Sequence, residues 1–131
     1  PLQRIQIIKS WIDENGRSRE KIYDVAGDAA NGATVNLSNC EQNGPGVEHL
    51  CAVWADEAFD ATTDAYYYSR ILEDPSCRWS QRICNASGVD CANPETIGPG
   101  LDACCSGAHN PIVQERAWTS PIFYYAGDAK G

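Results

Sequence analysis

The chain has 131 residues, of which 43% are hydrophobic, so it can bury one core, and a single domain is predicted over residues 1–131. Eighteen acidic against ten basic side chains give a net charge of −8, which repels nucleic-acid phosphates and anionic membrane surfaces. A nucleic-acid partner is therefore not predicted. No apolar run approaches the roughly 18 to 20 residues that cross a bilayer, so the sequence predicts no membrane span either.

A β-hairpin is predicted at the start of the chain. Residues 2–9 alternate apolar and polar side chains, a pattern typical of a strand, and a turn follows at residues 13–16. Asn15-Gly16 supplies the positive φ that tight hairpin turns demand, and residues 21–26 alternate as a returning strand requires.

Three further strands are predicted before residue 73. Residues 34–37 form a short candidate, and residues 47–54 form another after a loop rich in glycine and proline. Cys40 and Cys51 would then lie on neighbouring strands on either side of that loop, which predicts a disulfide between them. Residues 65–72 are rich in tyrosine, and their length suits a central strand.

The cysteine content indicates an oxidising compartment. The seven cysteines are Cys40, Cys51, Cys77, Cys84, Cys91, Cys104 and Cys105. Their spacing is irregular and contains no C-x-x-C pair, which favours disulfides over a zinc or iron–sulfur site and predicts an extracellular or periplasmic location. The chain opens with Pro1 and lacks methionine, so we interpret it as a piece of a longer polypeptide whose export signal would lie upstream.

A long loop insertion without a helix is predicted at residues 74–111, where proline and glycine recur. A loop of that length in a compact domain needs a constraint, and disulfides supply one, since each closure is worth on the order of 2 to 4 kcal/mol. Two bridges are predicted within the group from Cys77 to Cys105, with Cys84 to Cys91 as one choice and one thiol left over.

Regular strand patterns return at residues 112–118 and at residues 122–125, the closing strand. Seven candidate strands and no helix predict an all-β fold. For this length, the arrangement expected is an antiparallel two-sheet sandwich with a long disulfide-pinned loop.

Six stretches of the chain carry a resemblance to a known family: residues 1–11, 21–26, 52–60, 65–73, 77–80 and 114–122. In this order, and over almost the whole chain, they look like the C-terminal region of the bacterial family called domain of unknown function 3604. Members of that family are several times longer, and their upstream part is similar to metal-dependent hydrolase barrels of the amidohydrolase and polymerase-histidinol-phosphatase type. The resemblance implies a β-rich C-terminal piece of an exported metallohydrolase.

No catalytic site is predicted in this chain alone, and no cofactor is expected. His49 and His109 are 60 residues apart and cannot build the ligand cluster of a metal hydrolase. Cys104 or Cys105 near His109 could act as a nucleophile, but cysteines among so many others are more often bridged.

An acidic run could wrap a calcium ion, although it lacks the spacing of an EF-hand loop. Its carboxylates are Asp56, Glu57, Asp60 and Asp64. A solvated acidic loop is the simpler interpretation of the run.

Residues 114–121 combine residue types that concentrate binding energy at interfaces, namely Glu115, Arg116, Trp118 and Thr119. We expect them to face an upstream domain or a neighbouring copy, with core packing and an internal ion pair as the alternative. The strand aromatics could instead form a sugar-stacking platform, although cross-strand core pairs are the commoner arrangement. These aromatics are Tyr66, Tyr67, Tyr68, Trp79, Trp118, Phe123, Tyr124 and Tyr125.

The sequence thus predicts a non-catalytic, disulfide-stabilised accessory domain that packs on a hydrolase-like domain of a secreted or periplasmic parent protein. Two other classes stay open. One is a self-assembling extracellular subunit, which would form homo-oligomers through an exposed strand edge, and the other is a carbohydrate-binding module.

Overall fold

The computed structural model describes residues 1–127, and the chain divides into two compact units. Unit 1 consists of residues 1–29, 47–73 and the chain from residue 116 on, whereas unit 2 consists of residues 30–46 and 74–115. Each unit is therefore assembled from segments that are separated in the sequence. The prediction of a single domain over residues 1–131 stays a prediction.

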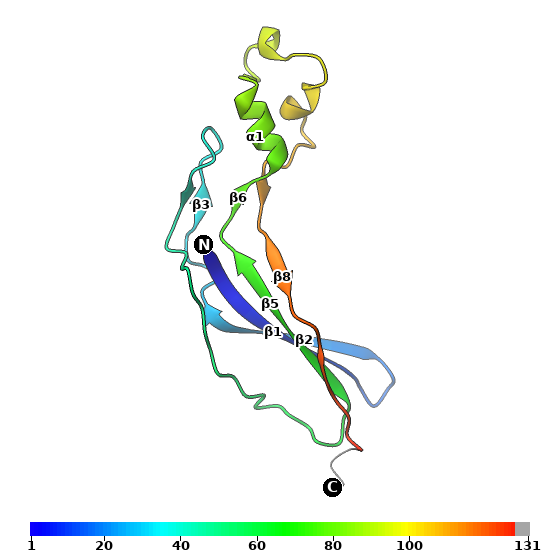
Figure 1. Ribbon diagram of the computed structural model, residues 1–131. Helices are drawn as coiled ribbons and strands as arrows, with labels where there is room; N and C mark the ends of the chain where they lie inside the picture. The colour runs from blue at the N-terminus through cyan, green and yellow to red at the C-terminus, as the bar shows by residue number, and fades with distance from the viewer. Residues whose placement is uncertain (128–131) are drawn as a thin grey trace. The chain divides into compact units, whose positions relative to one another are not determined.

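Unit 1 is built on a five-stranded antiparallel sheet (Figure 1). Its strands are β1 (Leu2–Ile12), β2 (Ser18–Gly27), β5 (Ala65–Glu73), β8 (Arg116–Trp118) and β9 (Ile122–Tyr124). The order is β2–β1–β5, and β8 and β9 share the other edge of β5. The predicted hairpin, the central strand and the closing strand are confirmed, and so is the all-β, antiparallel, sandwich-like fold class.

The turn between β1 and β2 is a five-residue loop, residues 13–17, rather than a two-residue Asn-Gly turn. Asp13 organises it, because its carboxylate accepts hydrogen bonds from the backbone N–H groups of Asn15 and Arg17 at 3.0 and 2.9 Å. The bond from Arg17 is the main reason that the pKa of Asp13 lies below its ordinary value. Within the loop, positive φ is found at Gly16 alone, at 74°.

Unit 2 contains short antiparallel strand pairs, one α-helix and two 3-10 turns. They are β3 (Thr34–Val35) with β4 (Gln42–Asn43), β6 (Ser76–Cys77) with β7 (Ile112–Val113), α1 (Trp79–Ala86), and the turns Pro94–Thr96 and Asp102–Cys105. The helix shows that the prediction of a helix-free loop is wrong. Gly88, at φ 66°, follows α1 and donates its N–H to the carbonyl of Asn85, as glycine commonly does past a helix end.

No helix in residues 1–127 is long and apolar enough to cross a membrane.

Three disulfides cross-link unit 2: Cys40–Cys77, Cys84–Cys104 and Cys91–Cys105. Two of them lie within the group from Cys77 to Cys105, but the specific pairings predicted, Cys40 with Cys51 and Cys84 with Cys91, are wrong. In the described part of unit 2, every buried apolar side chain is a cysteine, at positions 40, 77 and 84. Covalent bonds therefore replace most of the apolar packing that a core would provide.

Cys51 is an exposed free thiol because the strand predicted at residues 47–54 does not form. The backbone of this segment pairs with the sheet only at an isolated bridge between Val47 and Leu2. A strand there would have placed Cys51 beside Cys40, whereas the actual partner of Cys40 comes from β6, 37 positions further on.

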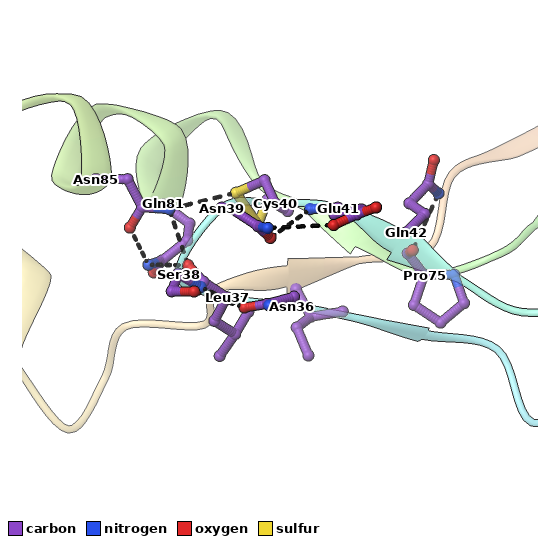
Figure 2. The surroundings of a disulfide bond; sticks show 12 residues. Asn36, Leu37, Ser38, Asn39, Cys40, Glu41, Gln42, Pro75, Gln81 and Asn85 are labelled. Carbon is purple, nitrogen blue, oxygen red and sulfur yellow. Dashed lines mark hydrogen bonds between the residues drawn. A yellow bond between two sulfur atoms is a disulfide. The ribbon is translucent and has the colours of Figure 1, made fainter.

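The Cys40–Cys77 disulfide joins the two sequence segments that make up unit 2 (Figure 2). Cys40 is buried, and its backbone adopts a left-handed conformation at φ 60°, which is unusual for any residue but glycine. Its N–H donates to the carbonyl of Asn36 at 2.7 Å, so a closed turn of the chain aims the sulfur at Cys77.

Amide side chains reinforce that disulfide (Figure 2). From α1, Asn85 and Gln81 donate to the carbonyl of Leu37 at 2.8 and 3.3 Å. From β4, Gln42 donates to the carbonyl of Pro75 at 3.0 Å. Residues 30–46 are thus held to residues 74–115 by one covalent bond and directional polar contacts.

Gly27, the last residue of β2, gives a prediction about the sheet. Its φ is 79°, and a Cβ at this position would lie 2.1 Å from the carbonyl oxygen of Gln3 on β1. We expect Gly27→Ala to lower the free energy of unfolding by about 3 kcal/mol, since left-handed strain and a backbone clash combine. Gly16→Ala is the matched control, with φ 74° but no atom within 4 Å of its Cβ, and should cost about 1 to 2 kcal/mol. Equal urea midpoints for the two variants would contradict the clash.

Candidate functional site

The sheet of unit 1 has two chemically different faces. Side chains alternate along a strand, and directly paired residues share a face. Lys9 pairs with Tyr67, so these two side chains lie on one face, which we call the covered face. Tyr66 pairs with Phe123, and both lie on the opposite face, which we call the aromatic face.

The chain itself covers part of the first face with the segment of residues 53–60. The ring of Trp54 lies 4.8 Å from that of Tyr23 on β2 and 6.3 Å from that of Tyr67 on β5. Next along the segment, Asp56 accepts hydrogen bonds from the ammonium of Lys9 at 2.5 Å and from the hydroxyl of Tyr67 at 2.8 Å. One aromatic ring and one carboxylate therefore fasten this irregular segment to the sheet.

Lys9 and Asp56 form a buried ion pair. Their side chains are 9% and 6% exposed, and the ammonium also donates to the carbonyl of Ala58 at 2.9 Å. Burial by itself raises the pKa of Asp56, but hydrogen bonds from Lys9 and Tyr67 outweigh it, and the net pKa is lowered. Burial likewise lowers the pKa of Lys9, yet the bond to Asp56 and its charge leave that pKa raised. Both groups are therefore charged throughout the physiological range.

The aromatic face carries a continuous line of rings. We call Tyr68, Tyr66, Phe123 and Tyr125 the aromatic row. Successive ring centroids along it lie 6.4, 5.8 and 6.2 Å apart. Phe123 and Tyr125 are 58% and 55% exposed, which is far more than aromatic side chains in a core would be. The row is thus a surface feature, and cross-strand pairing has not buried it.

Strand β8 extends the aromatic face. Arg116 pairs with Leu72 and Trp118 with Arg70, so both β8 side chains lie on the same side of the sheet as the aromatic row. Trp118 is 57% exposed, and Arg116 is exposed as well. The role of these residues at an interface stays a prediction, and their exposure places them outside the core.

The other two predicted interface residues, Thr119 and Glu115, lie in different surroundings. Thr119 is joined to β5, because its N–H donates to the carbonyl of Ser69 at 3.1 Å and its hydroxyl accepts from the N–H of Ser69 at 3.0 Å. Glu115 belongs to unit 2 and is exposed. Neither Glu115 nor Arg116 takes part in an ion pair among the described residues; the pairs there join Arg4 to Asp24, Lys9 to Asp56 and Arg19 to Asp13.

Three of the four carboxylates of the acidic run accept hydrogen bonds from protein groups. Asp56 is engaged by Lys9, whereas Asp60 accepts hydrogen bonds from the hydroxyls of Thr62 and Thr63 at 2.7 and 2.9 Å. Asp64 accepts from the backbone N–H of residue 126 at 2.7 Å, and Glu57 is exposed. Within residues 1–127 no three His, Cys, Asp or Glu side chains converge as metal ligands do. Calcium binding by this run stays a prediction.

The two histidines are held in different units. His109 hydrogen-bonds through Nε2 to the side chain of Gln81 at 2.9 Å in unit 2, and His49 is exposed in unit 1. Cys104 and Cys105, the thiols closest to His109 in the sequence, are both in disulfides. Neither sulfur is therefore a thiolate nucleophile for His109 to activate.

The sequence analysis missed the Lys9–Asp56 pair, whose members are 47 positions apart. The available signal was a lysine between Ile8 and Ser10 at the end of a predicted hairpin strand, because a charge there needs a partner once it is buried. Nothing local to Asp56 indicated that it would be that partner rather than a solvated acid.

Comparison with known proteins gives one family. The model for a family described as "Protein of unknown function (DUF3604)" matches residues 1–126, which is almost the whole chain. No curated protein and no solved structure gives a match.

Proposed function

This chain belongs to the DUF3604 family of proteins of unknown function, and from that premise we propose that it is a non-catalytic accessory domain that packs against a larger partner. The partner in this proposal is the metal-dependent-hydrolase-like part of a longer parent protein. The observation that carries the proposal is the exposed aromatic face, formed by the aromatic row together with Arg116 and Trp118.

Exposure of this kind is informative. Single exposed apolar residues are ordinary, whereas contiguous exposed aromatic rings mark surfaces that bind something. In unit 1 the buried apolar side chains are only Ile8, Ala65 and Leu72 among the described residues, so most large apolar groups lie outside the core. Covering Trp118 and Phe123 with a partner would bury area that the unit cannot bury by itself.

The disulfides support an extracellular or periplasmic setting for this function. Three bridges within one small unit are typical of proteins that mature in an oxidising compartment, where thiols are not kept reduced. The non-catalytic part of the proposal rests on the donor set, since His49 and His109 lie in different units and the cysteines next to His109 are oxidised.

Substitutions on β8 test the docking surface. We expect Arg116→Ala and Trp118→Ala each to weaken association of this chain with the upstream part of its parent by about 2 kcal/mol or more, since tryptophan and arginine dominate binding hot spots. Because both side chains are exposed, the isolated chain should keep its thermal midpoint. Isothermal titration of the separately produced upstream part measures the affinity.

Val53→Ala is the matched control, because Val53 is a fully exposed apolar side chain of the segment on the other face of the sheet. It should leave the affinity unchanged. Docking through the aromatic face is refuted if the β8 variants bind as tightly as the unchanged chain, or if they unfold it. Concentration-dependent self-association that Trp118→Ala abolishes, seen by analytical ultracentrifugation, would instead assign the face to a neighbouring copy.

A further inference from the structure

The covered face of the sheet contains a pocket next to the segment that Trp54 and Asp56 hold against it. Its volume is about 380 Å³, within the range of small-ligand sites. The rings of Trp11, Tyr23 and Tyr67 line it from β1, β2 and β5, and Lys21, Asp60 and Thr63 add polar groups. All of these residues belong to unit 1, so the sheet and its own covering segment form the site.

The charges in and beneath this pocket balance. Lys9 and Lys21 contribute two ammonium groups, while Asp60 in the lining and Asp56 behind it contribute two carboxylates. Lys9 is already bound to Asp56 and to the carbonyl of Ala58, so its charge is not free to hold an anion. A phosphate or a metal ion gains little from such a site, and a neutral ligand suits it better.

The lining also indicates what kind of neutral ligand fits. Flat aromatic rings accept the apolar C–H face of a sugar ring. The ammonium of Lys21 lies 4.8 Å from the centroid of the Tyr23 ring and has further N–H groups to donate to sugar hydroxyls. The carboxylate of Asp60 accepts three hydrogen bonds from Thr62 and Thr63, and an ionised carboxylate has lone pairs for one more from a sugar hydroxyl. The hydroxyls of Tyr23 and Tyr67 both contact Asp56, at 3.4 and 2.8 Å. They are therefore committed, and cannot donate to backbone carbonyls as the grooves that bind proline-rich peptides require.

We propose that this pocket binds one ring of a neutral glycan, with Trp11 as the stacking platform and Lys21 and Asp60 as the hydroxyl partners. This site differs from the sugar platform considered from the sequence, since Tyr67 is the only residue common to both. It is also independent of docking through the aromatic face, which lies on the other side of the sheet.

The test is isothermal titration of the full chain, with its disulfides intact, against cellohexaose, xylohexaose, mannohexaose and maltohexaose. At least one hexaose should bind with a dissociation constant between about 10 µM and 1 mM. Trp11→Ala should weaken that binding at least tenfold, Trp11→Tyr should restore most of it, and Lys21→Ala and Asp60→Asn should each weaken it several-fold. Trp118→Ala, on the aromatic face, should leave it unchanged.

Lys21 and Asp60 are exposed, so their substitutions keep the chain folded even if Trp11→Ala does not. Absence of binding by all four hexaoses at about 5 mM overturns the proposal. So does sugar binding that survives Lys21→Ala and Asp60→Asn but is lost in Trp118→Ala, which would move the site to the aromatic face. A proline-rich decapeptide that binds, and loses its affinity in Lys21→Ala, when no hexaose does would make the pocket a peptide site.

Discussion

Replacing Cys40 and Cys77 together with serine is expected to destabilise unit 2 by about 4 kcal/mol, the loop-closure entropy of a bridge that spans 37 positions. This bond has the longest span of the three and is the only one that joins residues 30–46 to residues 74–115. Without it, the left-handed turn at Cys40 loses its anchor, and the two segments are held by polar contacts, among them the amide bonds to Leu37 and Pro75 and the bond from Asn31 to Asp74 at 2.8 Å.

Hydrogen exchange measures this effect where it occurs. Amides of β3 and β4 should exchange much faster in the double serine variant, whereas those of β1 and β5 in unit 1 should change little. Cys51→Ser is the control, because Cys51 is exposed and unpaired, and should shift stability by less than about 0.5 kcal/mol. Unchanged protection of β3 and β4 in the double variant would show that polar contacts suffice.

Asp56→Asn is expected to cost about 3 to 5 kcal/mol, because it leaves the buried ammonium of Lys9 without a counter-charge. The segment of residues 53–60 should then lift from the covered face, and the contact of Trp54 with Tyr23 should be lost. Urea denaturation followed by tryptophan fluorescence reports both changes.

Two further variants separate charge from packing. The double substitution Lys9→Met with Asp56→Leu removes both charges, and it should recover most of the lost stability, as apolar replacements of buried ion pairs often do. Glu57→Gln, an exposed neighbour, should change stability by less than about 0.5 kcal/mol. If Asp56→Asn is as mild as Glu57→Gln, the pair does not hold the segment.

The same pair sets an expected pH dependence. The pKa of Asp56 is lowered from 3.8, so its contribution is present above that value and is lost as the pH falls through the folded-state pKa. The pKa values of Lys9 and Tyr67 are raised from 10.5 and 10.0, so their contributions are lost only as the pH rises past those values. Stability curves of the unchanged chain and Asp56→Asn should therefore converge in acid, and a constant gap down to pH 2 would contradict the linkage.

Local patterns carried most of the fold prediction for unit 1. The alternation of apolar and polar residues was enough to predict β1 and β2, which are neighbours in the sequence and pair with each other. The run of tyrosines was enough to predict β5, which pairs with the other side of β1. The segment of residues 47–54 carries similar apolar residues, but it attaches through the ring of Trp54 instead of a hydrogen-bond ladder. Periodicity does not distinguish these two ways of packing.

Unit 2 was harder to predict because its order is long-range and covalent. The spacing of cysteines does not determine which of them pair. The helix α1 was not predicted because its eight residues lie in a segment rich in proline, glycine and cysteine, which is typical of a loop. For the candidate sites, composition pointed to Arg116 and Trp118, whose exposure the structure then showed. The pocket around Trp11 and Lys21 depends on the register between β1, β2 and β5 and on a covering segment about 40 positions away. A local sequence motif therefore does not predict it.

The interleaving of the two units has a consequence for synthesis. The β1–β2 hairpin can form as soon as residue 27 leaves the ribosome, but the outer edge of β5 has no partner until β8 and β9 emerge. The 42 residues from 74 to 115 come in between, an interval of roughly 2 to 8 s at about 5 to 20 residues per second. Throughout it, a tyrosine-rich strand edge faces other nascent chains. A stalled or truncated product that ends before residue 116 would lack β8 and β9 and keep that edge unpaired, and an unpaired edge is a template for pairing with another chain.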